Sequence, residues 1–134
     1  MRLFTPLGGL LLCLSLGCGP GRIEMLTDRT DRYNKTVRWG NLAAAGHFIS
    51  DENRKTLLEK MGREIDRRRV FDFSIADIAI DPEKRKGSVL VEFSYYGISD
   101  QSLSYRQEMQ LWQWDSAKKD WFLIETRDLP ARRN

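Results

Sequence analysis

Cysteine, histidine and long apolar runs are scarce in this chain, and each scarcity excludes a class of structure. The 134 residues include two cysteines, both within the first 18 residues, and a single histidine, His47. The sequence beyond Cys18 therefore provides no cysteine pair for a disulfide and no cysteine–histidine set for a zinc site. The longest apolar stretch, residues 7–16, has about half of the roughly 20 residues that a membrane-spanning helix requires.

Motifs for common catalytic and nucleotide-binding chemistry are also missing. The chain contains no Gly-x-Ser-x-Gly elbow of the kind that carries a nucleophilic serine. Gly17, Gly19 and Gly21 do not follow a strand, so they are not expected to bind a phosphate. The net charge of +3 is only mildly basic, and nucleic acid is not an expected partner. We therefore predict no metal and no cofactor.

What the chain does have at its start is the layout of a secretory signal peptide. Arg2 provides a positive start, residues 7–16 an apolar core, and Gly17-Cys18 a small-residue cleavage point. Removal of residues 1–17 leaves 117 residues of net charge +2, which is enough for one compact domain. The expected parts are the signal peptide 1–17, a tether 18–22, a single domain 23–128 and a tail 129–134.

The stretch Leu14-Ser15-Leu16-Gly17-Cys18 resembles the lipobox of bacterial lipoproteins. Its last two residues match, whereas the family prefers leucine where Ser15 stands and a small residue where Leu16 stands. The resemblance implies that Cys18 is acylated and that its acyl chains hold the protein on a membrane. Gly19, in place of an aspartate, implies the outer membrane, with the domain facing the periplasm. The alternative is an ordinary secreted protein in which Cys18 is a free thiol.

The first half of the domain is predicted to be helical. Four residues recur at helical spacing on one face of the first helix: Leu26, Thr30, Tyr33 and Val37. Asn41 is expected to cap a short second helix. Ser50 is expected to cap a third helix, with Asp51 and Glu52 in its first turn. Glu64 and Arg68, four residues apart, are expected to pair on the solvent side of that helix.

In the second half of the chain the apolar period changes to two, which predicts strands. Turns are expected at residues 81–87 and 115–120, with a polar loop over 97–103 between them. The last strand is expected over 121–126. A shift of the apolar parity near Ile75 predicts either a bulge or burial of both strand faces.

Two of the expected strands carry distinct apolar faces. The second strand has one such face, formed by Val89, Val91, Phe93 and Tyr95. The third strand has Tyr105, Met109 and Leu111 on one face and Trp112 and Trp114 on the other. The tryptophan pair therefore requires a cover, which a helix, a second subunit or a ligand could provide.

Helices followed by an antiparallel meander predict an α+β domain, with the helices packed on one face of a curved sheet of about four strands. The element order resembles the nuclear transport factor 2-like, cystatin-like fold, which is cone-shaped. The segments that carry the resemblance are residues 33–42, 112–115 and 121–124. Proteins with this fold include isomerases, hydratases and non-catalytic accessory domains, so the resemblance implies no single activity.

Aromatic residues form the candidate ligand-binding set. They are Tyr33, Trp39, Phe93, Tyr95, Trp112 and Trp114. Such residues can line a cavity, although core packing between helix and sheet also explains them. For an enzyme of this fold, the candidate acids and bases are His47, Asp72 and Asp77. Strand parity places the two aspartates on opposite faces unless a bulge realigns them.

The sequence favours a lipid-anchored protein of the cell envelope with a non-catalytic domain. That domain would bind a ligand or a protein partner, or form a homodimer through the open face of its sheet. The alternative is a small cone-fold enzyme, of isomerase or hydratase type, that uses an aspartate or His47 in the cavity.

Overall fold

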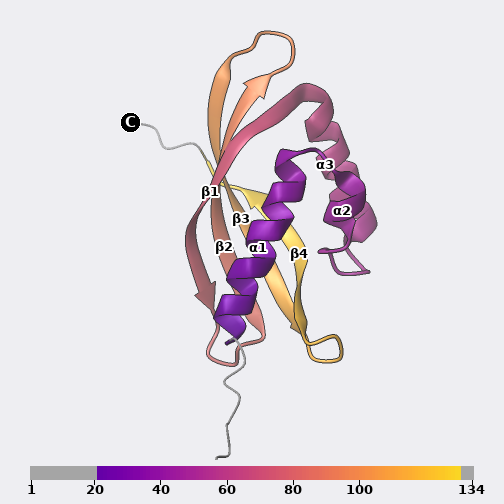
Figure 1. Cartoon of the computed structure of the whole chain (residues 1–134), viewed down its shortest axis with the longest axis vertical. Helices are drawn as coiled ribbons and strands as arrows, with labels where there is room; N and C mark the ends of the chain where they lie inside the picture. Colours follow the sequence, from indigo (N-terminus) through magenta and orange to yellow (C-terminus); the bar gives the residue numbers. More distant parts are fainter. Residues whose placement is uncertain (1–20, 131–134) are drawn as a thin grey trace, which may run out of the picture.

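The computed structural model describes residues 21–130, in which three helices precede four strands (Figure 1). The helices are α1 (Arg22–Arg38), α2 (Leu42–Gly46) and α3 (Arg54–Arg67). The strands are β1 (Arg68–Ile80), β2 (Lys86–Gly97), β3 (Leu103–Asp115) and β4 (Asp120–Asp128). They form one antiparallel sheet in the order β1-β2-β3-β4, which confirms the predicted α+β meander. The predicted signal peptide and Cys18 lie outside the described residues.

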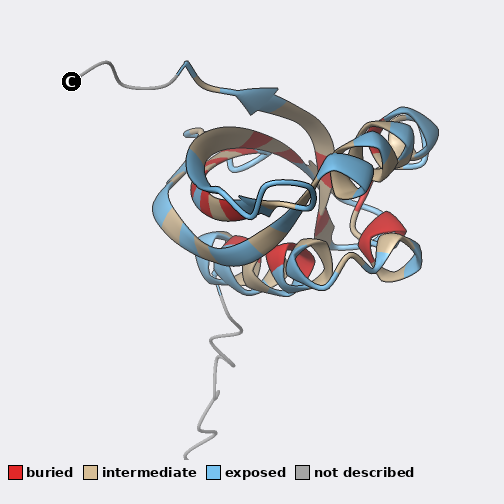
Figure 2. Ribbon diagram, turned by 90° about the horizontal axis from the view of Figure 1, so that it is seen from above, coloured by how far each residue is buried: buried red, intermediate tan, exposed pale blue. Residues whose placement is uncertain are grey.

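The sheet is strongly curved, and the helices lie along one side of it (Figure 2). Register shifts interrupt β1 between Val70 and Asp72 and between Ile75 and Asp77. A further register shift, opposite Leu111 and Trp112 of β3, leaves Ile124 of β4 as the extra residue. Such bulges increase the local twist and bend of a strand. The predicted bulge near Ile75 is therefore confirmed, and it is one of several that allow the sheet to wrap around α1.

The core lies between α1 and the concave face of the sheet. Leu26, Thr30 and Tyr33 of α1 are buried, as the helical spacing predicted. The predicted apolar face of β2 is also buried; it consists of Val89, Val91, Phe93 and Tyr95. The hydrophobic free energy of the domain comes largely from this contact between helix and sheet.

The tryptophan face of β3 is the inner face, and helix α1 is its cover. Trp112 is fully buried, and its ring meets that of Tyr33 edge-on at 5.6 Å. The Arg22 guanidinium lies 4.5 Å from the Trp114 ring centroid. The opposite face of β3 is exposed at Tyr105, where the side chain is 74% accessible. The sequence allowed a helix, a second subunit or a ligand to cover this face, and in the structure a helix covers it.

The predicted start of the third helix is wrong. Helix α3 begins at Arg54, and residues 51–53 form a turn. The cause is a tertiary contact, because the Ser50 amide donates to the Leu123 carbonyl at 3.0 Å and so holds this segment against β4. Asp51 therefore precedes the helix, where it binds Arg54 at 2.7 Å.

The predicted solvent-facing position of the Glu64–Arg68 pair is also wrong. The pair itself forms, with 2.7 Å between Glu64 Oε2 and Arg68 Nη2. Both side chains line an internal cavity instead, because α3 packs this end against the start of β1. No helix within residues 21–130 is long and apolar enough to cross a membrane.

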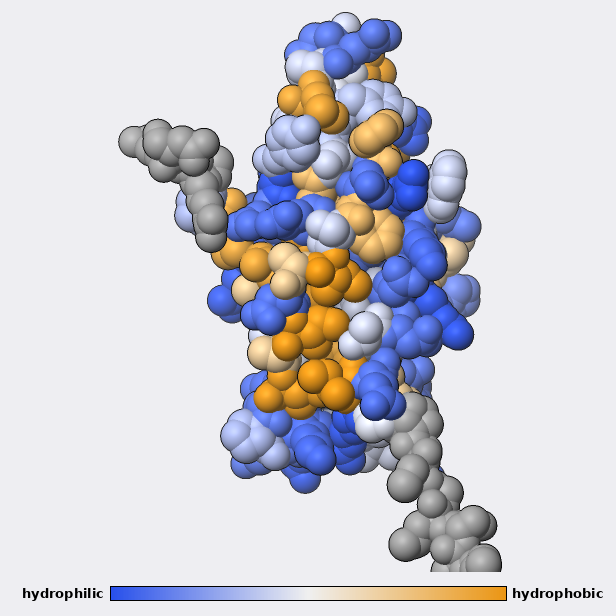
Figure 3. Space-filling model, turned by 60° about the vertical axis from the view of Figure 1, so that its left-hand side comes forward, coloured by the Kyte–Doolittle hydropathy of each residue, from blue (hydrophilic) through white to orange (hydrophobic). Residues whose placement is uncertain are grey.

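Figure 3 looks onto the β1 side of the sheet, where hydrophobic side chains gather in a patch bordered by hydrophilic ones. Strand β1 is an edge strand of the sheet. Its inward residues pack only partly against the core; they are Phe73, Ile75, Ile78 and Ile80.

Candidate functional site

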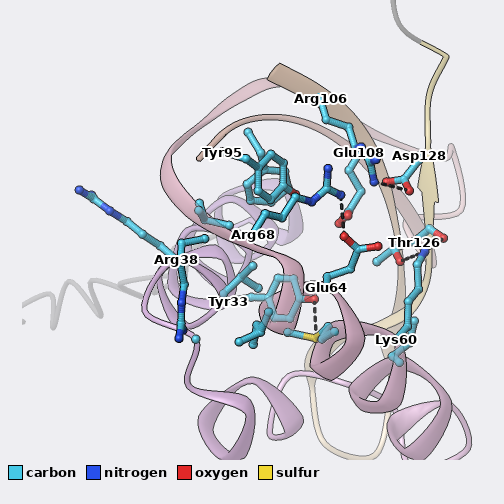
Figure 4. Close-up of a pocket in the computed structure, with 18 residues that line it drawn as sticks. Tyr33, Arg38, Lys60, Glu64, Arg68, Tyr95, Arg106, Glu108, Thr126 and Asp128 are labelled. Carbon is cyan, nitrogen blue, oxygen red and sulfur yellow. Dashed lines mark hydrogen bonds and ion pairs between the residues drawn. The ribbon is translucent and has the colours of Figure 1, made fainter. Parts of the chain in front are cut away.

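A cavity of about 60 Å³ lies between α1, α3 and the concave face of the sheet (Figure 4). Apolar and aromatic side chains form much of its wall, among them Tyr33, Val37, Leu57, Met61, Phe93 and Tyr95. Its polar residues include Lys60, Glu64, Arg68, Arg106, Glu108, Thr126 and Asp128. Pockets for drug-sized ligands begin at roughly 300 Å³. This cavity therefore suits a ligand, or part of one, with only a few heavy atoms.

The cavity borders a larger and more open groove. The groove has a volume of about 870 Å³ and shares Arg68, Phe93, Arg106 and Asp128 with the cavity. Its other residues are mostly polar and include Ser74, Ser94, Ser104 and Gln107. A ligand in the cavity could therefore have a polar extension in the groove.

Glu108 of β3 is the most perturbed acid of the cavity. Burial raises the pKa of its carboxyl to about 7, and the Asp128 charge also raises it. A hydrogen bond from Gln110 and the positive charges of Lys60 and Arg106 oppose this increase. Glu108 forms no salt bridge with a described residue. Its carboxyl is therefore partly protonated at neutral pH.

A chain of buried amides holds Glu108 in place. Gln110 Nε2 donates to Glu108 Oε1 at 3.1 Å and to Asn34 Oδ1 at 2.8 Å. Asn34 Nδ2 returns a bond to Gln110 Oε1 at 3.2 Å and donates to the Thr30 carbonyl at 2.8 Å. The Asn34 and Gln110 side chains are completely buried. The network thus links the acid on the sheet to the backbone of α1.

The other charged groups at the cavity are largely paired. Arg68 binds Glu64, and its guanidinium lies 4.1 Å from the Tyr95 ring centroid. Arg106 binds Asp128 at 2.9 Å. Figure 4 shows Glu64, Arg68 and Glu108 converging in the middle of the cavity. The paired residues come from α3 and from β1, β3 and β4, so the pairs join these elements around the cavity.

Arg69 also lines the cavity and forms no salt bridge with a described residue, and Lys60 is the other unpaired cation there. Its ammonium donates to the Thr126 hydroxyl at 3.0 Å and to the Thr126 carbonyl at 3.3 Å. It forms no salt bridge with any residue between 21 and 130. Its charge is therefore not neutralised by direct contact with an acid in the part of the chain that the structure describes.

Two tyrosines present hydroxyl groups without a good acceptor. The Tyr33 hydroxyl contacts only the Met61 sulfur, at 3.6 Å, and a thioether is a weak acceptor. The Tyr95 hydroxyl has no hydrogen bond with a described residue. Burial raises the pKa of both phenols, and the nearby Glu108 charge raises it further. Both hydroxyls are therefore protonated donors at neutral pH.

The structure brings together three of the six predicted ligand-binding aromatics. Tyr33, Phe93 and Tyr95 line the cavity. Trp112 is buried in the core next to Tyr33. The other two do not line the cavity either, since Trp114 packs under Arg22 and Trp39, just after α1, is 76% exposed.

None of the three predicted acids and bases lines the cavity. His47 is exposed after α2, where its backbone carbonyl accepts from Arg29 at 3.2 Å. Asp72 and Asp77 are both exposed, and the bulge between Ile75 and Asp77 realigns them onto one side of the strand. Within residues 21–130 no cluster of three or more acids or histidines could hold a metal ion.

Glu108, Gln110 and Asn34 are not among the residues predicted from the sequence. The signal was present in the alternation of β3, because Glu108 and Gln110 share strand parity with Trp112. Assigning the tryptophan face to the core would have placed both polar residues inside as well.

No protein-family model matches the sequence, and a comparison with curated protein sequences finds no significant relative. Solved structures do match. A ketosteroid isomerase-like protein from Erwinia carotovora atroseptica SCRI1043 has a TM-score of 0.65 at 10% identity, over 84% of this chain and 100% of its own. An NTF2-like protein from Cytophaga hutchinsonii ATCC 33406 has a TM-score of 0.62 at 9% identity, over 81% of this chain and 98% of its own.

A protein with a cystatin-like fold from Nostoc punctiforme PCC 73102 also matches. Its TM-score is 0.57 at 8% identity, over 78% of this chain and 86% of its own. Identities this low establish the fold alone. The chain has the nuclear transport factor 2-like, cystatin-like fold that its element order resembled.

Proposed function

We propose that this protein is a lipid-anchored protein of the cell envelope whose domain binds a small ligand in the cavity, without transforming it. One observation carries the binding role: Glu108 lies in a cavity with largely apolar walls and has no salt-bridge partner among the described residues.

A carboxyl group in such a position costs folding free energy, because a buried charge is poorly solvated. Perturbed titratable groups in cavities are found more often at functional sites than elsewhere. A largely apolar cavity with a few polar groups is also the usual form of a ligand site. The amide network through Asn34 and Gln110 would fix the orientation of the acid toward the ligand.

Support for the membrane part of the proposal comes from the first 18 residues. Their apolar core is too short to span a bilayer, and Cys18 follows it in a lipobox-like context. One acyl chain binds a membrane only marginally, whereas several chains on one residue give stable attachment.

Filling the cavity tests the binding role. Val70 lines the cavity, and Val70→Phe places a larger apolar side chain there. Saturation-transfer NMR with a library of compounds of up to eight heavy atoms should detect ligands for the wild-type chain. We expect the same compounds to lose binding in Val70→Phe.

The neighbouring Phe71 is 60% exposed and supplies the matched control, Phe71→Val. This variant should retain the binding of every compound that the wild type binds. A library with no binder, or binders that Val70→Phe retains at full affinity, would exclude the cavity as the site.

A general acid–base enzyme is the second candidate, and the Glu108 pKa of about 7 favours it. A base with a pKa near the working pH is efficient at proton abstraction. The Tyr33 hydroxyl could donate to an oxygen of the substrate. The ketosteroid isomerase-like structural neighbour makes proton abstraction next to a carbonyl the reaction class to test first.

Exchange of the α-protons of butan-2-one in deuterated water, followed by NMR, tests this candidate. Catalysis by the wild type that falls at least tenfold in Glu108→Gln would support it. His47→Ala should retain the full rate, because His47 lies outside the cavity. An exchange rate equal to that of buffer would exclude this reaction.

A further inference from the structure

We propose that the ligand of the cavity is a small monocarboxylic acid, whose carboxylate lies among Tyr33, Lys60 and Glu108 and accepts hydrogen bonds from them. This inference rests on the proposed binding function, because it names the chemical class of the ligand.

Several hydrogen-bond donors at the cavity have no oxygen acceptor. The Tyr33 hydroxyl has only a sulfur partner, and the Tyr95 hydroxyl has no hydrogen bond with a described residue. Arg68 Nε is buried and also has no acceptor among residues 21–130. Lys60 uses two bonds to Thr126 and has three N–H groups. A carboxylate brings two oxygens with about four lone-pair sites, which matches this surplus of donors.

The charges of the residues at the cavity also favour an anionic ligand. The Arg68–Glu64 and Arg106–Asp128 pairs are each neutral. Of the other charged residues at the cavity, Arg38 binds Asp72 at 3.7 Å, whereas Lys60, Arg69 and Glu108 have no salt-bridge partner among the described residues. When Glu108 takes up a proton, the positive charges of Lys60 and Arg69 are uncompensated, and an anion offsets one of them.

Glu108 need not repel such an anion. Two carboxyl groups in close contact share one proton, because both cannot ionise together. A pKa of about 7 keeps Glu108 protonated over the range in which a simple carboxylic acid is already ionised. The protonated Glu108 is a donor to the carboxylate, which gives the pair a short, charge-assisted hydrogen bond.

The cavity also limits the size of the acid. Its volume of about 60 Å³ leaves room for few heavy atoms. Val37, Leu57 and Met61 would surround a short alkyl chain. A four-carbon acid is therefore a suitable probe.

Butyrate, butan-1-ol and butylamine share the same chain length and differ in charge, so they separate the classes of ligand. We would titrate each into the full-length protein at pH 6 and pH 8 and measure affinity by NMR line shifts. Butyrate should bind at least about tenfold more tightly than the other two at pH 6. Its affinity should fall about tenfold by pH 8, because binding requires one proton on a group with a pKa near 7.

Two variants connect this behaviour to the proposed residues. Glu108→Gln keeps a donor at all pH values, so butyrate affinity should become independent of pH. Lys60→Gln should weaken butyrate binding about tenfold and leave butan-1-ol binding unchanged. Lys55→Gln, an exposed lysine of the same helix, is the matched control and should bind butyrate like the wild type.

Each other outcome counts against the inference. If the alcohol or the amine binds and butyrate does not bind more tightly, the carboxylic acid is wrong and the binding function stands. If none of the three binds and the library screen also finds no ligand, both are wrong. A pH dependence that persists in Glu108→Gln would exclude Glu108 as the proton carrier.

Discussion

Glu108 couples the chemistry of the cavity to the stability of the fold. Burial raises its pKa from 4.5 to about 7, so the folded state holds the proton more tightly than the unfolded state. Stability from this group is therefore fully present below pH 4.5 and is lost as the pH rises to 7. A pKa difference of this size between the folded and unfolded states corresponds to about 3 kcal/mol in the free energy of unfolding.

We therefore predict that the free energy of unfolding decreases between pH 4.5 and pH 7.5, and that Glu108→Gln removes most of this decrease. Urea unfolding at several pH values measures it. Glu59→Gln, an exposed acid on α3, is the control and should follow the wild-type profile. If Glu108→Gln shows the same slope as the wild type, the raised pKa is wrong.

The Asn34–Gln110 pair supports a second prediction at this scale. Asn34→Ala removes the partner of a completely buried amide, and an unsatisfied buried polar group costs roughly 1–3 kcal/mol. We expect a loss of this size in urea unfolding. The double variant Asn34→Leu with Gln110→Met replaces both amides by apolar groups and should recover part of it. If Asn34→Ala lowers the free energy of unfolding by less than about 0.5 kcal/mol, the pair contributes little to stability.

For the helices and strands, residue periodicity correctly predicted the features that depend on the local sequence. The buried faces of α1 and β2, the Asn41 cap and the bulge near Ile75 all follow from residue spacing and capping preference. The start of α3 does not, because the bond between Ser50 and Leu123 joins residues far apart in the sequence. Tertiary contacts override local helix signals in such cases.

The site was less predictable than the fold. The predicted aromatic set included Tyr33, Phe93 and Tyr95, which line the cavity. The sequence did not distinguish these from Trp112, which is buried in the core. Glu108 shares strand parity with Trp112, but parity alone does not identify the inner face of β3. Its position depends on which face of β3 meets α1, and that is decided by packing of the whole domain.

Close packing of β2 against α1 supports a prediction for Gly87. A Cβ atom at this position would lie 2.5 Å from Leu26 Cδ2, and Leu26 is fully buried. Gly87→Ala should therefore destabilise the domain by roughly 1–3 kcal/mol, the usual cost of overpacking a core. Urea unfolding provides the measurement.

The control is Gly62→Ala in α3, where the nearest atom to a new Cβ, in the Leu42 side chain, is 3.8 Å away. This change should stabilise the domain by up to about 1 kcal/mol, because alanine is the better helix former. If Gly87→Ala were equally harmless, the contact between β2 and α1 would be looser than the structure indicates.

At the scale of the whole molecule, the cavity lies far from the start of the described domain. Helix α1 begins at one end of the molecule, beside the loops that join β1 to β2 and β3 to β4 (Figure 1). Val37, which lines the cavity, is 15 residues further along α1, or about 22 Å at 1.5 Å per residue. An anchor at Cys18 would thus hold the opposite end of the molecule near the membrane and leave the cavity facing water.

Homodimer formation through the outer face of the sheet stays a prediction at this scale. The exposed Tyr105 and the partly exposed Met109 and Leu111 share that face. Light scattering of the purified chain should give twice the monomer mass, and Met109→Glu should reduce it to one. A monomeric wild type at high micromolar concentration would contradict the prediction.

The proposed anchor at Cys18 would act at the end of the molecule opposite the cavity, so Cys18→Ala should affect membrane attachment alone. The variant lacks the only sulfur that could carry acyl chains after removal of residues 1–17. It should therefore fail to incorporate labelled palmitate and should move from the detergent phase to the aqueous phase in phase partitioning, since the proposed acyl chains on Cys18 would supply the membrane affinity. Its affinity for cavity ligands should equal that of the wild type, because the two sites are independent. Unchanged palmitate labelling would contradict the anchor, whereas lost ligand binding with lost labelling would show that the tether contributes to the cavity.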